Sequence, residues 1–264
     1  MASATLSQLA QKSISERIRE LEAEKTKLLC DATNAHTLQK MFESTWLPNY
    51  YKNAVYFNWF NPETKKLTIN DLPKLPVPDD NTSFLGSLLG QEHYNPAIVI
   101  GGGDISDDEI KALKECKGIH IFCTNKYLKR VLKNEIKIDF CGVIHTTPEI
   151  LDDFKGDEEI TKKYKDMRCF AVNTIDYELA KFLVNNFKEV YWATAVIDPT
   201  YLANVTCLLS RLVNMPECST QGNVGATMVL LAKAMGYNPI SLLGFSMGHH
   251  PLKTWTMHES FECK

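Results

Sequence analysis

The sequence lacks paired cysteines, a long apolar run and a strong excess of charge of one sign. Its eight cysteines include no CxxC pair, so their spacing fits neither a zinc ribbon nor a small disulfide-stapled domain. Several cysteines fall inside apolar runs such as HIFCT and DFCGV. This placement predicts reduced, buried thiols in a cytoplasmic protein.

The absence of an apolar N-terminal segment argues against a secretory signal. Residues 1–20, MASATLSQLAQKSISERIRE, are polar, and no later run is long enough to span a bilayer. The formal net charge of -3 and the pI near 6.2 give no reason to expect a nucleic-acid partner. The 264 residues, 44% hydrophobic and 23% charged, are typical of a globular protein with a substantial core.

Residues 1–84 are expected to form a helical and aromatic N-terminal extension. Apolar residues recur at helical steps over 7–40, which predicts a helix that packs on the body of the protein or on a second copy in a homo-oligomer. The aromatic residues between 46 and 60 are expected to pack together, with AVYFNWF as a strand. Pro73, Pro76 and Pro78 then mark a linker.

Residues 85–264 are expected to form the second domain, because strand-like and helical patterns alternate there. The strand-like runs are AIVI, GIHIFCT, KIDFCGVIHT, RCFAVNT, EVYWATAVI and NPISLLGFSM. Short apolar runs of this kind are typical of parallel strands buried on both faces. We therefore predict an α/β fold with a Rossmann-like, mostly parallel sheet covered by helices.

A glycine turn, Gly101, Gly102 and Gly103, directly follows the first of these strands and leads into Asp104 and Ser106. Glycines at a strand end let backbone N–H groups approach a phosphate, which the start of the next helix also attracts. Ser106 replaces the third glycine of a dinucleotide-binding motif, and no GK[ST] follows for a P-loop. A tight turn without any ligand is the alternative interpretation.

Polar residues also follow the next two strands. Asn125 comes after GIHIFCT and can contact a base or ribose, although a helix cap explains it equally well. His145 and Thr146 end KIDFCGVIHT, where a general base or a phosphate contact is expected. Asp139 begins the same strand and is therefore expected to be structural.

A second polar turn, which contains Ser219, Gln221, Gly222 and Asn223, precedes the apolar helix VGATMVLLAKAMG. Its N–H groups are expected to form an anion site, or else simply to begin a capped helix.

The last strand opens into Gly244, Ser246, His249 and His250. Adjacent histidines point in different directions, so they do not predict a metal site by themselves. GFSMG has no clear acid after it and no following helix, which argues against a serine hydrolase.

Taken together, these loops resemble the archaeal 6-hydroxymethylpterin diphosphokinase (MptE-like) family. That family is similar in pattern to the motility-accessory glycosyltransferases and to bacterial sialyltransferases. The resemblance covers roughly residues 93–250, and its most specific part runs from Gly222-Asn223-Val224-Gly225 to Gly244. The proline of the family's first loop is absent. His145 and the pair Phe245-Ser246 stand where the family often has acidic residues.

The resemblance implies a nucleotide-dependent transferase that acts on 6-hydroxymethyl-dihydropterin with ATP and Mg²⁺. Asp104 is the candidate metal ligand, and His145 and His249 are the candidate catalytic residues. The expected partners are a nucleoside phosphate and a small-molecule acceptor. Glycosyl transfer from a nucleotide sugar, and a non-catalytic nucleotide-binding module, remain alternatives. The candidate nucleotide and phosphate contacts are Gly101, Gly102, Gly103, Asp104, Ser106, Asn125, Thr146, Ser219, Gln221, Gly222, Asn223, Gly244 and Ser246.

Overall fold

The computed structural model describes residues 25, 40–75, 95–196, 208–220 and 223–245. Their contacts divide the chain into two compact units, one before Trp46 and one from Trp46 onward, and the second contains the whole sheet. Most of the helix predicted over 7–40, and the predicted domain boundary at 84, lie outside the described residues. Within the described residues, no helix is long and apolar enough to cross a membrane.

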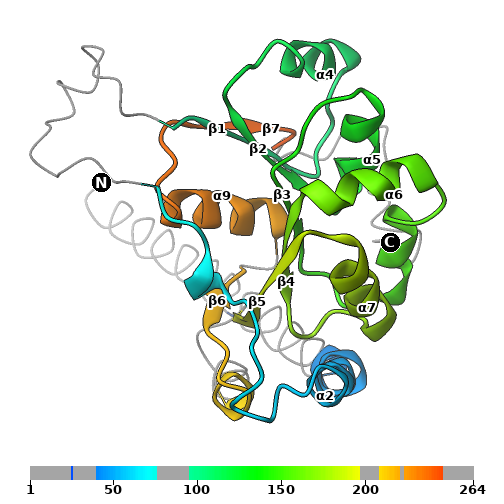
Figure 1. The fold of residues 1–264 in the computed structure, drawn as a ribbon, viewed down its shortest axis with the longest axis vertical. Coiled ribbons are helices and arrows are strands. Elements are labelled where there is room, and N and C mark those ends of the chain that lie inside the picture. Colours follow the sequence, from blue (N-terminus) through cyan, green and yellow to red (C-terminus); the bar gives the residue numbers. More distant parts are fainter. Residues whose placement is uncertain (1–24, 26–39, 76–94, 197–207, 221–222, 246–264) are drawn as a thin grey trace, which may run out of the picture. The chain divides into compact units, whose positions relative to one another are not determined.

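Seven parallel strands form the sheet, in the order β6-β5-β4-β3-β2-β1-β7 (Figure 1). This arrangement confirms the predicted α/β fold with a parallel sheet. Most of the strands are buried along nearly their whole length, which is why they read as apolar runs in the sequence. The strands are β1 (Ala97–Ile100), β2 (His120–Thr124), β3 (Phe140–Val143), β4 (Arg168–Val172), β5 (Glu189–Val196), β6 (Glu217–Ser219) and β7 (Ile240–Leu243).

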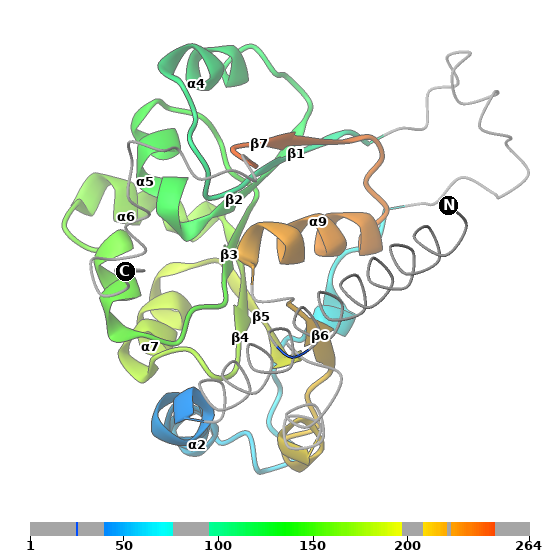
Figure 2. The same cartoon turned by 180° about the vertical axis from the view of Figure 1, so that it is seen from behind.

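The connections between β1 and β5 lie on one face of the sheet, since the strands advance in one direction and parallel crossovers are right-handed (Figure 1). The connection from β6 to β7 runs back past β1, so its helix α9 (Val224–Ala234) covers the opposite face (Figure 2). The elements of the first face are α4 (Asp107–Leu113), α5 (Asn125–Lys133), η3 (Pro148–Asp153), α6 (Glu158–Lys163), η4 (Tyr164–Asp166) and α7 (Tyr177–Asn186).

Helix α9 packs closely on β1, β2 and β3 because β3 carries a glycine at the contact. A Cβ on Gly142 would lie 2.3 Å from Sδ of Met228 and 3.2 Å from Cγ2 of Val224. Gly142 is buried, and Met228 is fully buried. Glycine at position 142 therefore lets α9 pack closely against the sheet.

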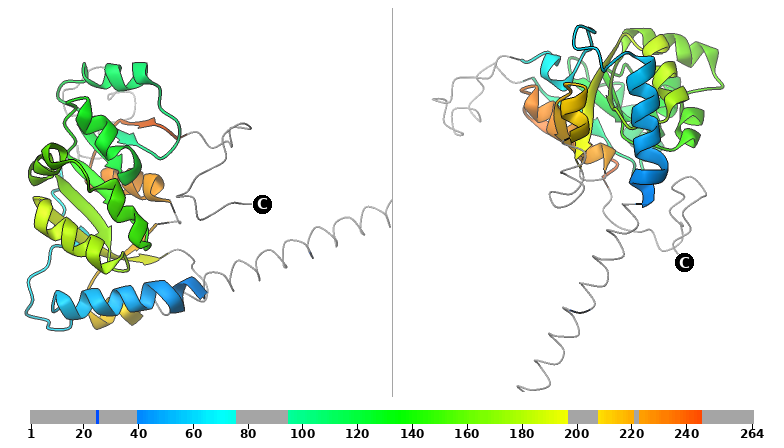
Figure 3. Two further views of the ribbon diagram at one scale, coloured as in Figure 1. Left: turned by 90° about the vertical axis from the view of Figure 1, so that its right-hand side faces the viewer. Right: turned by 90° about the horizontal axis from the view of Figure 1, so that it is seen from below.

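The segment AVYFNWF is not the strand that the sequence predicts. Its first residues end helix α2 (Leu47–Tyr56), and a turn follows. Phe57 and Trp59 pack against Trp192 of β5, with ring centroids 5.8 and 4.9 Å from that of Trp192. Aromatic residues favour strands in general, but here their rings bury themselves on the sheet from a turn. Figure 3 shows α2 beside α7.

Two short helical elements flank α2 in the chain. These are η1 (Phe42–Trp46), which precedes it, and η2 (Ile69–Asp71), which follows it. Thr68 is the N-cap of η2 and also forms a parallel bridge with Trp192 at the outer edge of β5. Further along β5, strand β6 pairs with the same edge, and Thr194 N donates to Pro216 O at 2.9 Å.

Three cysteines stand side by side in register on β2, β3 and β4: Cys123, Cys141 and Cys169. All three are free thiols with no exposed surface, as the apolar surroundings in the sequence predict. Burial raises the pKa of the Cys123 and Cys169 thiols well above the ordinary value. These side chains therefore act as small apolar residues in the core.

Candidate functional site

The candidate site residues that the structure describes lie at the carboxyl edge of the sheet, where all strands of a parallel sheet end together. The glycine turn follows β1, Asn125 follows β2, and His145 and Thr146 follow β3. Neighbouring strands are spaced by about 4.8 Å, so Ser219 at the end of β6 lies roughly 24 Å along the edge from the β1 turn. Gln221, Gly222, Ser246 and His249 lie outside the described residues.

The glycine turn packs against the end of β7. The N–H groups of Gly101 and Gly103 donate to the carbonyls of Leu243 and Gly244, at 2.8 and 2.7 Å. A Cβ on Gly101 would lie only 2.6 Å from the Gly244 oxygen. The close approach of β7 therefore requires glycine at 101 and occupies two of the three glycine N–H groups.

Phe245 lies between the glycine turn after β1 and the start of α9. Its ring carbons would be 3.0 Å from a Cβ on Gly101 and also 3.0 Å from a Cβ on Gly225. An aromatic ring therefore fills the space between the β1 turn and the start of α9. It stands where the resembled family often has an acidic residue.

The start of α9 is capped by its own asparagine. The Asn223 Oδ1 accepts from the N–H groups of Gly225 and Ala226, at 2.8 and 3.2 Å. Such a cap satisfies the N–H groups that would otherwise attract an anion. Thr227 Oγ1 also donates to the Asn223 carbonyl at 2.9 Å, which fixes the turn further.

The start of α5 differs, because its N-cap residue makes no side-chain cap. Thr124 Oγ1 instead donates to the Gly101 carbonyl at 3.1 Å. The Nζ of Lys126, in the first turn of α5, donates to the Gly102 carbonyl at 2.7 Å. A positive side chain and the positive end of the helix therefore meet beside the glycine turn.

Gly102 is the open member of the glycine turn. The nearest atom to a Cβ placed on it is the Lys126 Cδ, at 3.9 Å. Within the described part of the chain, no hydrogen bond is donated by the Gly102 N–H. Gly102, Lys126 and the start of α5 thus offer donors to an anion at the ends of β1 and β2.

The loop between β1 and α4 is held to α5 by an arginine. Arg130 Nη1 donates to the Ile105 carbonyl at 2.8 Å, and Arg130 Nη2 pairs with Asp107 at 2.6 Å. Ser106 is occupied by a capping box with Glu109, whose Oε2 accepts from the Ser106 N–H at 2.7 Å. The predicted phosphate contact Ser106 is therefore also the cap of α4.

Asp104 is an exposed carboxylate on this loop. Burial, with a smaller contribution from the Asp104 charge, raises the pKa of the neighbouring Tyr127 hydroxyl. Within the described residues, no three histidine, cysteine or acidic side chains gather as metal ligands. Magnesium bound to nucleotide phosphates needs only one or two protein carboxylates, so Asp104 fits such a role by its chemistry.

The loops after β3 and β4 are held by an asparagine clamp, Asn49 and Asn53, one turn apart on α2. Asn49 Nδ2 donates to the carbonyls of Thr146 and Thr174, at 2.9 and 3.2 Å. Asn53 Nδ2 donates to the carbonyls of Asn173 and Ile175, at 3.1 and 2.9 Å. The clamp places Thr146 and the neighbouring half-buried His145 at the edge of the sheet.

Sequence reasoning missed the clamp and Lys126. Thr146 is buried, and its carbonyl is engaged by the clamp, whereas the Asn125 side chain donates to Asp153 at 2.6 Å. The one available signal for Lys126 is its place two residues after a strand end. The signal for the clamp is the spacing of two asparagines on one helix face.

Comparisons with known proteins give a limited result. No protein family and no curated protein matches the sequence. A glycosyltransferase structure, that of MAf glycosyltransferase from Magnetospirillum magneticum AMB-1, is similar in fold, with a TM-score of 0.49 and 15% sequence identity. The similarity covers 77% of this chain and 28% of that one, so this chain spans less than a third of that protein's length.

Proposed function

We propose that this protein binds a nucleoside phosphate at the ends of β1 and β2 and transfers a group from it to a small-molecule acceptor. One observation carries the proposal: the start of α5 has no side-chain cap and stands beside Lys126 and the open Gly102. A phosphate there gains helix N–H groups, a glycine N–H and a positive charge. Of the two phosphate-binding turns expected from the sequence, the proposal keeps the glycine turn after β1, and it replaces the capped start of α9 with the start of α5.

Diphosphokinase chemistry on 6-hydroxymethyl-dihydropterin is the first candidate reaction, because the sequence resembles that family. Phosphoryl transfer depends mainly on positioning and on neutralising the phosphate charge, and Mg²⁺ normally supplies much of this neutralisation. Lys126 would bind the phosphates, and Asp104 would hold the metal. The exposed position of Asp104 on the β1 loop supports this assignment.

Glycosyl transfer from a nucleotide sugar is the second candidate, and the position of His145 favours it. His145 follows β3, which is the strand next to β2 and stands about 4.8 Å from it. A histidine there can accept the proton of an acceptor hydroxyl. A module that binds nucleotides without turnover is the remaining alternative.

Binding is tested by isothermal titration with ATP, CMP and UDP, with and without Mg²⁺. Lys126→Ala is expected to weaken nucleotide binding about 10- to 100-fold, because a charge-assisted contact contributes roughly 1.5–3 kcal/mol. Lys133→Ala is the control, since Lys133 stands in the last turn of the same helix and pairs with Asp157 at 3.6 Å. Equal affinities for the two variants would contradict the phosphate site.

The reaction is tested by product analysis. Release of AMP from ATP in the presence of the pterin and Mg²⁺ supports the diphosphokinase. Release of free nucleotide from a nucleotide sugar, lost in His145→Ala, supports glycosyl transfer. Nucleotide binding without either product, unchanged in His145→Ala, identifies a binding module.

A further inference from the structure

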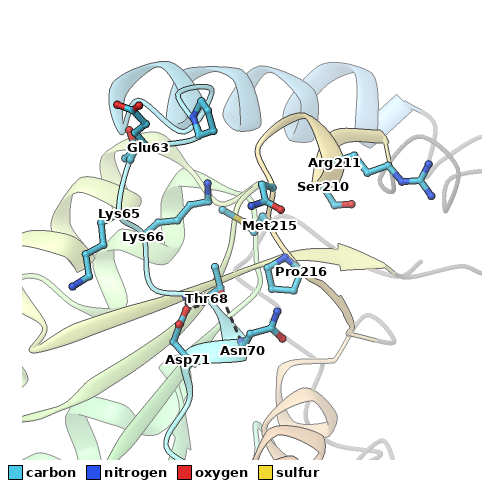
Figure 4. A pocket seen from close by; sticks show the side chains of 13 residues that line it. Glu63, Lys65, Lys66, Thr68, Asn70, Asp71, Ser210, Arg211, Met215 and Pro216 are labelled. Carbon is cyan, nitrogen blue, oxygen red and sulfur yellow. Dashed lines mark hydrogen bonds between the residues drawn. The ribbon is translucent and has the colours of Figure 1, made fainter.

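A cavity of about 680 Å³ lies at the outer edge of β5, away from the candidate site. It opens between residues 62–71 and residues 210–216 (Figure 4). Its volume is within the range of small-molecule sites, about 300–1,000 Å³. Polar side chains line most of it, among them Thr64, Asn70, Ser210 and Asn214.

The cavity sits where the outer neighbour of β5 changes. Trp192 N donates to Leu67 O at 3.0 Å, and two residues later Thr194 N donates to Pro216 O at 2.9 Å. Strand β5 stands three strands from β2, so the cavity is separated from the start of α5 by about 14 Å of sheet. A ligand in the cavity therefore does not occupy the proposed nucleotide site.

Three cations line this cavity, Lys65, Lys66 and Arg211, and Lys66 is the least exposed of them. Figure 4 shows its side chain extending toward the 210–216 side, whereas the Lys65 side chain extends the other way. Within the described residues, Lys66 makes no ion pair, and its partial burial lowers its pKa. A partly desolvated ammonium without a counter-charge is costly, and a bound anion removes this cost.

Two of the acidic groups nearby, Asp71 and Glu217, already have donors of their own. Both the N–H and the hydroxyl of Thr68 donate to Asp71 Oδ2 at 2.8 Å, which lowers the pKa of Asp71 together with the nearby charge of Lys65. Ser210 donates to Glu217 at 2.8 Å. These carboxylates are therefore engaged by donors that do not include Lys66.

We propose that this cavity binds a small hydroxylated anion, such as a sugar monophosphate, with Lys66 as its counter-charge. The amides of Asn70 and Asn214 suit the hydroxyl groups of such a ligand. Glu63 and Asp71 also line the cavity, and their negative charge disfavours a highly charged anion such as a nucleoside triphosphate. The cavity and the start of α5 thus select different ligands.

The test uses the full chain with three probes: inorganic phosphate, glucose 6-phosphate and glucose. Binding is followed by backbone-amide NMR and by isothermal titration. Glucose 6-phosphate is expected to bind more tightly than phosphate, and glucose not to bind. Chemical-shift changes are expected at the backbone amides of Leu67, Thr68 and Asn214. Absence of glucose 6-phosphate binding up to about 10 mM overturns the proposal, because that limit corresponds to only about 3 kcal/mol.

Matched variants locate the charge. Lys66→Gln keeps most of the side-chain length and is expected to weaken glucose 6-phosphate binding at least about tenfold. Lys66→Arg and the neighbouring control Lys65→Gln are expected to change it by less than about threefold. Equal glucose 6-phosphate affinities of Lys66→Gln and the unmodified protein refute the role of Lys66. Chemical-shift changes confined to the ends of β1 and β2 refute binding in this cavity. Lys126→Ala is expected to leave this binding intact, which separates it from the proposed function.

Discussion

Replacing Asn53 by alanine is expected to destabilise the protein by about 1.5–5 kcal/mol. Asn53 is fully buried, and its side-chain NH₂ donates to the carbonyls of Asn173 and Ile175. Each buried carbonyl left without a donor costs about 1–3 kcal/mol, while alanine returns up to about 0.7 kcal/mol of helix propensity. The expected loss is a large share of the roughly 5–15 kcal/mol typical of a domain.

Asn53→Asp provides a sharper test, because its effect depends on pH. A buried carboxylate facing two carbonyl oxygens is disfavoured, so the pKa of the introduced carboxyl group in the folded variant must lie above its unfolded value of about 3.9. The protonated acid can donate one hydrogen bond, whereas the carboxylate can donate none. The variant is therefore expected to be least impaired below about pH 4 and to lose stability as pH rises through the raised pKa.

Urea unfolding followed by far-UV circular dichroism measures both effects. Lys52→Ala is the control, since Lys52 is exposed on the same helix and its replacement is expected to change stability by less than about 0.5 kcal/mol. The reasoning fails if Asn53→Ala is as stable as Lys52→Ala. It also fails if Asn53→Asp loses no stability, relative to Asn53→Ala, between about pH 4 and pH 7.

Gly142→Ala is expected to cost about 1–3 kcal/mol, because its Cβ would overlap Met228, and Met228→Ala in the same chain should relieve part of that cost. If the losses of stability in the two single variants simply add in the double variant, measured by urea unfolding, Met228 of α9 does not restrict the side chain at position 142 of β3. Glu189→Gln should reduce the fall in the free energy of unfolding at acid pH, since Arg168 donates to Glu189 and lowers the pKa of Glu189. That stabilisation is present above about pH 4.3, amounts to at most about 1 kcal/mol at this partly exposed pair, and is lost as pH falls. An unchanged acid limb in urea unfolding from about pH 7 to about pH 3 would contradict this role.

The strands were predictable where burial on both faces imposes an apolar run, as in β1, β2 and β4. Strand β6 was not predictable, because it has three residues, of which only Cys218 is buried. The end of α2 was mistaken for a strand because the rings of Phe57 and Trp59 read as strand residues. Their true partner, Trp192, is distant in sequence.

The candidate site could be predicted only in outline. Glycines at 101–103 and polar residues at the strand ends are visible in the sequence, but their neighbours are not. The need for glycine at 101 arises from the Gly244 carbonyl, which belongs to a segment far along the chain. The open start of α5 arises because Thr124 donates to Gly101 instead of capping its own helix.

The pairing of β7 with β1 also affects when this part of the sheet can fold. These two strands pair across roughly 140 residues of chain, which makes their contact among the most entropically costly in the sheet. The glycine turn receives the carbonyls of Leu243 and Gly244 only after this pairing. During synthesis, β1 and its turn therefore wait for β7, the last strand of the described sheet, and the edge that carries the glycine turn is among the last regions of the domain to form.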